Sequence, residues 1–194
     1  MKTGVFLARM QPLHKGHMHI IEKMIEECDE VLIVIGSADK KGTIRNPLEI
    51  DFRESILKNW VFGFDMFKKY NRKLMKVSIA TLNDFTYEDD ILSNKEWGRY
   101  LYYNIISKIS QKEFSLYYSD DIKIIQDWFD WDLSNKISIR HIDRSCVLDG
   151  ISATKIREAI VSNDKEYVNK YCIFDNGTYN ILEKEIKKIY NTEE

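Results

Sequence analysis

Apolar residues along the chain follow two patterns that alternate. Short continuous apolar runs occupy Val5 to Ala8 and Val31 to Ile35. Such runs are typical of strands buried on both faces, as in parallel sheets. Between them, from Met18 to Cys28, apolar residues recur at helical spacing. Strand, helix and strand therefore fit into about 30 residues, the length of one βαβ unit.

The alternation continues toward the C-terminus. Further strands are predicted over Val77–Thr81, Phe114–Tyr118 and Ile137–Ile142, and helices over 46–60, 97–109, 120–131 and 152–161. Asn46 is expected to cap the first of these helices, with Pro47 in its first turn and Glu49 as the capping-box acid. Residues 63–73 are expected to form a helical extension or insertion, residues 83–94 a polar loop, and two short helices the end of the chain. This order predicts a doubly wound α/β fold with a five-stranded parallel sheet and helices on both faces.

Length and composition narrow the class of protein. A chain of 194 residues fits one domain over 1–194, with the C-terminal helices from about 162 packed on it. The formal net charge of −2 gives no electrostatic support for a nucleic-acid partner. No window approaches the roughly 18 apolar residues of a membrane span, and the first apolar run is too short for a signal peptide. We therefore expect a soluble cytoplasmic protein without a membrane partner, in which Cys28, Cys146 and Cys172 are reduced thiols.

Candidate chemistry first appears between the first predicted strand and helix, over Arg9 to His17. In an open parallel sheet, ligands bind at the carboxyl ends of the strands, and a helix N-terminus there suits phosphate. His14 and His17 lie three residues apart on one side of the first turn and offer N–H donors, which could stabilise the charge of a departing pyrophosphate. Gly16 permits close approach of a ligand or backbone, and Arg9 adds positive charge.

Two other interpretations of these histidines exist. His14, His17 and His19 could form a metal cluster, although no cysteine or acid stands nearby at ligand spacing. They could also be ordinary surface histidines, which the position at a strand–helix junction disfavours.

A second group of anion-binding residues opens the helix after the fifth predicted strand. Ser152 is a natural N-cap, Thr154 brings a hydroxyl to the first turn, and Arg157 follows one turn later. Hydroxyls, helix N–H groups and a guanidinium at one helix end form an anion cradle. The alternative is a simple helix cap followed by a solvated arginine.

Both segments resemble a known family. Arg9-Met10-Gln11-Pro12 followed by His14-Lys15-Gly16-His17 resembles the HxGH signature of the nucleotidyltransferase superfamily, and is especially similar to the archaeal-type nicotinamide mononucleotide adenylyltransferases. Gly150–Arg157 is similar to the ISxTxIR motif of the same superfamily, with Ala153 where Ser or Gly is frequent. The resemblance implies a Rossmann-like domain. It implies catalytic roles for His14, His17 and Arg157, and ATP-binding roles for Arg9, Gly16, Gly36, Arg53, Ser152 and Thr154.

The region between the motifs carries weaker similarity. Gly36-Ser37-Ala38 and Thr43–Pro47 resemble a stretch of the archaeal-type enzymes, and Arg53 falls where they have a phosphate-binding arginine. The alternative for Arg53 is an ion pair with Glu49 at i,i+4 spacing.

The substrate segment of the family is matched by Asn94 and Trp97. By this resemblance Trp97 stacks on the nicotinamide ring, Asn94 is among the polar groups that read its carboxamide, and Asp84 belongs to an aspartate-containing loop. The alternative is that Trp97 is a core residue on the helix that contains Leu101.

The resemblance implies transfer of AMP from ATP to nicotinamide mononucleotide, giving NAD⁺ and pyrophosphate without a covalent intermediate. Mg²⁺ is expected on the phosphate oxygens, with no dedicated metal site in the protein. One rival is another superfamily transferase that uses ATP or CTP and a different phosphorylated substrate, and a second is a nucleotide-binding regulator without turnover. An oxidoreductase is disfavoured because GxGxxG is missing from the first strand–helix turn. The choice between nicotinamide and nicotinate, and association into a homo-oligomer, stay open.

Overall fold

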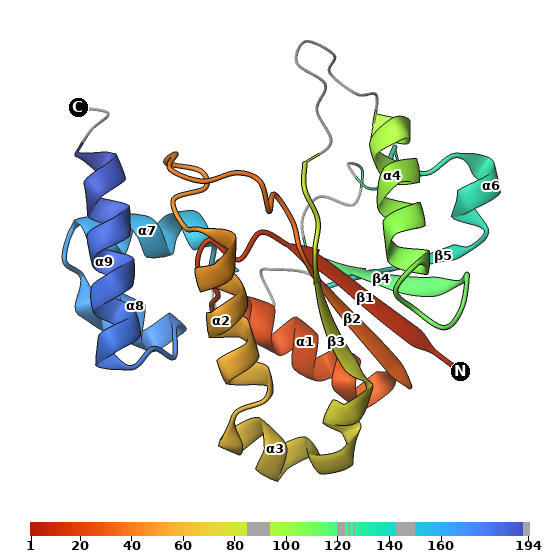
Figure 1. The fold of residues 1–194 in the computed structure, drawn as a ribbon, viewed down its shortest axis with the longest axis horizontal. Helices are drawn as coiled ribbons and strands as arrows, with labels where there is room; N and C mark the ends of the chain where they lie inside the picture. Colours follow the sequence, from red (N-terminus) through yellow and green to blue (C-terminus); the bar gives the residue numbers. More distant parts are fainter. Residues whose placement is uncertain (85–93, 120–122, 124, 126, 143–149, 192–194) are drawn as a thin grey trace.

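A computed structural model describes residues 1–84, 94–119, 123, 125, 127–142 and 150–191. Strands and helices alternate along most of this length (Figure 1). The strands are β1 (Thr3–Ala8), β2 (Glu30–Ile35), β3 (Val77–Thr81), β4 (Phe114–Tyr118) and β5 (Ile137–His141). The helices are α1 (Lys15–Glu27), α2 (Ile50–Val61), α3 (Phe64–Tyr70), the 3-10 helix η1 (Asn71–Lys76), α4 (Asn94–Ile106), α6 (Trp131–Ser134), α7 (Ala153–Val161), α8 (Lys165–Tyr171) and α9 (Asn176–Tyr190).

The five strands form one parallel sheet in the order β3-β2-β1-β4-β5. β1 pairs with β2 on one side, Val5 opposite Leu32, and with β4 on the other, Val5 opposite Leu116. The strand order reverses between β1 and β4, and ligands of open α/β sheets bind in the crevice at the carboxyl ends of such a pair. The predicted Rossmann-like, doubly wound fold is confirmed.

Helices cover both faces of the sheet, which explains the continuous apolar runs of the strands. Alternate residues of β1 point to opposite faces: Phe6 packs in a cluster with α1, α2 and α3, whereas Val5 packs in a second cluster with α4. Figure 1 shows α1, α2 and α3 on the side of the sheet away from α4.

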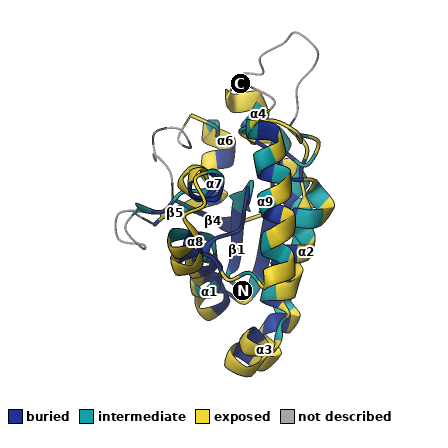
Figure 2. Cartoon of the chain, turned by 90° about the vertical axis from the view of Figure 1, so that its left-hand side faces the viewer, coloured by how far each residue is buried: buried dark blue, intermediate teal, exposed yellow. Residues whose placement is uncertain are grey.

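A third apolar cluster joins α7, α8 and α9 at one end of the sheet (Figure 2). Ile156 and Ile160 of α7 pack there with Leu182 and Ile186 of α9, all fully buried. Leu48, in the loop before α2, joins the same cluster and links these helices to the rest of the fold. Two closing helices were predicted as short, but α9 has 15 residues.

The start of α2 differs from the prediction. Its N-cap is Glu49, without a side-chain hydrogen bond, so the expected cap by Asn46 is wrong. The backbone N–H of Asn46 instead donates to Thr43 Oγ1 at 3.1 Å in a turn before the helix, and the Asn46 side chain is buried. Residues 63–73 are helical as expected, within α3 and η1.

The predicted helix over 120–131 is also wrong in part. Of its described residues, 127 and 128 form a turn, and α6 only begins at Trp131. The carbonyl of Trp128 in this turn lies directly against Gly98 of α4. Residues 85–93 of the predicted loop, and Cys146, lie outside the described residues. Cys28 and Cys172 are free and buried. In the part of the chain that is described, no helix is long and apolar enough to cross a membrane.

Candidate active site

The N-terminus of α1 is capped by the histidines of the first motif. His14 Nδ1 accepts a hydrogen bond from the Gly16 backbone N–H at 3.2 Å, and His17 Nδ1 accepts from the His14 N–H at 3.4 Å. The two rings stack with centroids 3.8 Å apart. A neutral imidazole that accepts at Nδ1 carries its proton at Nε2. The cap therefore fixes both rings as Nε2–H donors.

Gly16 makes this arrangement possible. A Cβ at this position would lie 3.0 Å from the His14 ring and 3.0 Å from the Ile151 side chain. Gly16 thus lets α1 approach the segment that precedes α7. The close approach predicted for Gly16 is therefore between two protein segments in this structure. Lys15 points elsewhere, because its Nζ donates to the Lys170 carbonyl at 2.6 Å.

The second motif opens α7 as expected. Ser152 is the N-cap, and its hydroxyl accepts from the Lys155 N–H at 3.3 Å. Arg157 is not a solvated arginine: it is 5% exposed, and its guanidinium donates to the Gln11 carbonyl at 2.7 Å and to Thr154 Oγ1 at 3.2 Å. The Arg157 side chain therefore connects the second motif to the first, although Gln11 lies 146 residues earlier in the sequence.

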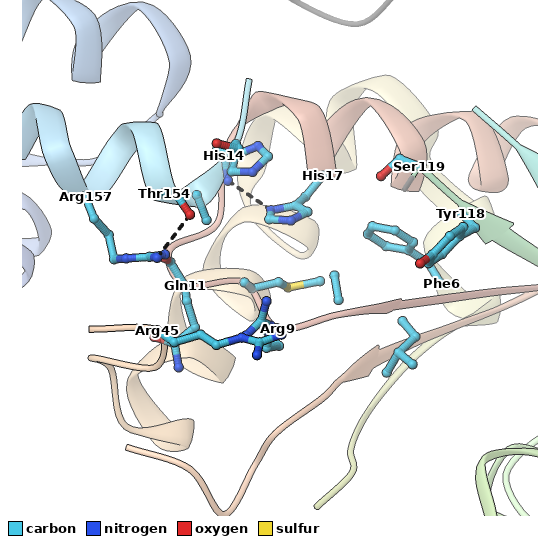
Figure 3. Close-up of a pocket in the computed structure, with 15 residues that line it drawn as sticks. Phe6, Arg9, Gln11, His14, His17, Arg45, Tyr118, Ser119, Thr154 and Arg157 are labelled. Atoms are coloured by element: carbon cyan, nitrogen blue, oxygen red, sulfur yellow. Dashed lines mark hydrogen bonds between the residues drawn. The ribbon is translucent and has the colours of Figure 1, made fainter. Parts of the chain in front are cut away.

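A cavity of about 390 Å³ lies between the two motifs, at the carboxyl ends of β1 and β4 (Figure 3). Figure 3 shows the two imidazoles on one side of this cavity and the guanidinium groups of Arg9 and Arg45 on another. Six residues predicted from sequence line it together: Arg9, His14, His17, Ser152, Thr154 and Arg157. Their side chains make its wall rich in donors and positive charge, which suits polyphosphate.

A second cavity, of about 510 Å³, adjoins the first and shares Arg9, Arg45 and Tyr118 with it. Its lining also includes three residues predicted from the family resemblance, Gly36, Asp84 and Trp97. Asp84 accepts a hydrogen bond from Ser37 Oγ at 3.0 Å, which holds the start of the loop after β3 against the end of β2.

Trp97 combines two of the roles considered for it. It packs against the core cluster that contains Leu101, and it also lines the second cavity. Its ring meets the edge of Trp128, with centroids 6.2 Å apart. Gly98 permits this contact, because a Cβ there would lie 1.7 Å from the Trp128 carbonyl oxygen.

Three predicted site residues, Gly16, Arg53 and Asn94, line neither cavity. Arg53 is 1% exposed and donates to the carbonyls of Arg9 and Gly36, both at 2.9 Å, and of Ser37 at 3.0 Å. It holds the ends of β1 and β2 together beneath the site, and burial lowers its pKa to about 10, which leaves it charged at neutral pH. The alternative ion pair with Glu49 is wrong, since that carboxylate pairs with Lys41 at 2.9 Å. Asn94 is the exposed first residue of α4.

Sequence reasoning missed several residues of the site. Arg45 lies within the quoted Thr43–Pro47 segment but was not chosen as a ligand residue, and it lines both cavities. Gln11 belongs to the first motif. Its side-chain Nε2 donates to the Leu48 carbonyl at 3.1 Å, and its Oε1 accepts from the Leu48 N–H at 2.9 Å. Trp128 and Ser119 carried no local signal, because only the fold brings them to the crevice.

Comparison with known proteins defines the class. A family model described as cytidylyltransferase-like matches residues 5–159, most of the chain and both motifs. The chain belongs to this cytidylyltransferase-like family.

More particular similarities point to one group of enzymes. The nicotinamide-nucleotide adenylyltransferase of Aeropyrum pernix is 32% identical over 101 residues, 52% of this chain and 52% of that protein. The enzyme of the same name from Pyrococcus furiosus is 44% identical over 57 residues, 29% of this chain and 30% of that protein. The matches therefore span about half of these relatives or less. A bifunctional NMN adenylyltransferase/ADP ribose pyrophosphatase from Francisella tularensis, in complex with AMP and a manganese ion, has the same fold, with a TM-score of 0.70 and 22% identity over 98% of this chain and 51% of that one.

Proposed function

We propose that this protein is an enzyme that transfers AMP from ATP to nicotinamide mononucleotide, giving NAD⁺ and pyrophosphate. One observation carries the proposal: donor side chains from residues 9–17 and 152–157 line one cavity at the point where the strand order reverses. The names of the archaeal relatives support nicotinamide mononucleotide as the acceptor.

Each part of the first cavity has a role in this reaction. The triphosphate would lie between the N-termini of α1 and α7, in contact with Arg9, Thr154 and Arg157. His14 and His17 would donate from Nε2 to oxygens of the leaving pyrophosphate. Because these donors are oriented before substrate binds, they would stabilise developing charge without reorganisation.

The second cavity would take the mononucleotide. Its 5′-phosphate would lie near Arg9 and Arg45, which line both cavities, and its pyridine ring near Trp97. This arrangement would bring an attacking phosphate oxygen to the α-phosphorus from the side opposite the leaving group. Positioning and charge stabilisation would then supply most of the rate enhancement, and no protein nucleophile is needed.

Mg²⁺ is the metal we propose. Among the described residues no group of three or more His, Cys, Asp or Glu side chains could hold a metal ion, and the first cavity is lined by arginines and histidines. This donor set fits an ion that enters on the phosphates of ATP with mostly water ligands. When bound, Mg²⁺ would neutralise part of the phosphate charge. The free thiols of Cys28 and Cys172 support a cytoplasmic location.

Pyrophosphate release tests the proposal directly. The protein would be mixed with Mg²⁺, with ATP or CTP, and with nicotinamide mononucleotide, nicotinate mononucleotide or another phosphorylated acceptor. We expect rapid release with ATP and nicotinamide mononucleotide, accompanied by NAD⁺. The family match favours cytidylyl transfer as the second candidate, which CTP-dependent release would support. If the protein binds nucleotide but releases no pyrophosphate with any pair of substrates, the remaining candidate function is a nucleotide-binding regulator without turnover.

A further inference from the structure

The corner formed by α3 and η1 exposes an unusual group of apolar side chains. Phe62, Phe64 and Phe67 are 49%, 78% and 57% exposed, and Met75 is 87% exposed. None of the four lines either cavity of the candidate active site. Exposed apolar residues scattered singly are ordinary, but three phenylalanines within six positions indicate a surface that meets something apolar.

The same corner carries positive charge. Lys68, Arg72 and Lys73 are exposed, and no ion pair of the described chain involves them. Lys69 and Lys76 are engaged nearby, with Glu22 and with the Cys28 carbonyl. In a chain with a formal net charge of −2, this is a local excess of cations beside the exposed phenylalanines.

The corner is firmly attached to the rest of the fold. Met66 and Tyr70, on the inner side of α3, belong to the main core cluster. Tyr70 also donates through its hydroxyl to the carboxylates of Glu22 and Glu26 of α1, at 3.2 and 2.8 Å. Figures 1 and 2 both show α3 projecting at one extremity of the molecule, and Figure 2 shows it largely exposed. The phenylalanines are therefore presented outward from an anchored helix.

We propose that this corner docks the protein on an anionic phospholipid surface. The phenylalanines would enter the boundary between headgroups and acyl chains, while Lys68, Arg72 and Lys73 would contact the headgroup phosphates. The expectation of no membrane partner rested on the lack of a spanning segment and of a signal peptide in the sequence, and neither observation bears on docking at a bilayer surface. A second copy of the chain fits the corner poorly, because it would bring like charges together. Single-stranded RNA is an alternative ligand for aromatic and basic residues, and the test below distinguishes it from lipid.

Vesicle co-sedimentation tests the proposal, with vesicles of phosphatidylcholine alone or with phosphatidylglycerol. We expect binding only to the mixed vesicles, weakened by salt as the Debye length falls from about 10 Å at 0.1 M to about 3 Å at 1 M. Charge reversal by Lys68→Glu, Arg72→Glu and Lys73→Glu should weaken binding by about fivefold or more per site. Phe64→Ser with Phe67→Ser should weaken it by roughly tenfold or more.

Matched controls use exposed residues on other elements. Trp131→Ser, 83% exposed on α6, controls for the loss of an aromatic side chain, and Lys108→Glu, Lys112→Glu and Lys184→Glu control for net charge. All variants should retain the parent's thermal unfolding and pyrophosphate release. Equal vesicle binding by the parent and by the variants of α3 and η1 would overturn the proposal. Failure of the parent to bind the mixed vesicles would also overturn it. Binding of RNA instead, or self-association that Phe64→Ser and Phe67→Ser abolish, would then identify the ligand of this corner.

Discussion

At the scale of single residues, the site depends on donors whose direction is set by the backbone. The N-terminus of α1 uses Nδ1 of both motif histidines as hydrogen-bond acceptors, which leaves Nε2 as the protonated nitrogen of each ring. Spacing alone predicted two imidazoles on one side of a helix. It could not predict that His14 is the N-cap and that its ring stacks on His17.

The donor at His17 Nε2 leads to the first prediction. An Asn side chain can replace the Nδ1 acceptor but does not reach as far as Nε2. We therefore expect His17→Asn to preserve folding and to lower kcat by roughly 10²–10³-fold, the usual cost of one charge-stabilising donor. His19→Ala is the control, since His19 is exposed on the same helix. Near-parent turnover in His17→Asn would remove leaving-group stabilisation by this ring.

Trp97 gives a second prediction, which concerns the substrate. Stacking of a base on an aromatic residue is worth about 1–3 kcal/mol, so Trp97→Leu should weaken NAD⁺ binding by roughly 5- to 150-fold. ATP affinity should change far less, because its phosphates lie between the motif helices. Titration calorimetry can measure both, with Trp131→Leu as the exposed control. Unchanged NAD⁺ affinity would leave Trp97 with its packing role alone.

Two residues have partners that sequence analysis did not predict. Arg53 donates to three carbonyls at the ends of β1 and β2, and its contact with phosphate stays a prediction. Asn46 was predicted to cap α2, and its side chain is buried before the helix begins. In both cases the residue type was informative, but the partner lies in another part of the chain and depends on the fold.

At the scale of elements, hydrophobic periodicity predicted all five strands to within two residues at either end. β1, β2 and β4 are buried along most of their length, which favours apolar runs, whereas the edge strands β3 and β5 are partly exposed. Periodicity failed over 127–130, where aromatic residues suggested a helix and the chain forms a turn. In that turn the Trp128 carbonyl contacts α4 at Gly98, a tertiary contact that local sequence does not encode.

The contact at Gly98 yields an element-scale prediction. A methyl group there would overlap the Trp128 carbonyl, so α4 or the turn would have to shift. We expect Gly98→Ala to lower the free energy of unfolding by about 1–3 kcal/mol, the usual cost of overpacking, and to weaken mononucleotide binding because Trp97 is adjacent. Chemical denaturation measures the first effect and substrate KM the second. Tyr103→Ala, exposed on the same helix, should change neither by as much.

At the scale of the whole molecule, the candidate site brings together the first and second motifs, which lie near the two ends of the residues matched by the family model. Strands alternating with helices predict the sheet. In that sheet only β4 separates β1, which precedes the first motif, from β5, which precedes the second, so both motifs lie at the carboxyl ends of the strands. The apolar pattern of the last two helices predicted that they pack on the domain. It did not reveal that they bury the back of α7, the helix that carries Arg157.

This arrangement links the C-terminal helices to ATP binding. Leu182 of α9 is fully buried against α7, so Leu182→Ala should lower the free energy of unfolding by about 2–5 kcal/mol. The neighbouring Ile181→Ala, at a site 49% exposed, should have a much smaller effect. Because the cavity left by Leu182→Ala loosens the support of α7, the KM for ATP should also rise, while the KM for nicotinamide mononucleotide changes little. Kinetics at a temperature where both variants are folded would measure this. An unchanged KM for ATP in a destabilised Leu182→Ala protein would show that α7 holds Arg157 in place without help from α9.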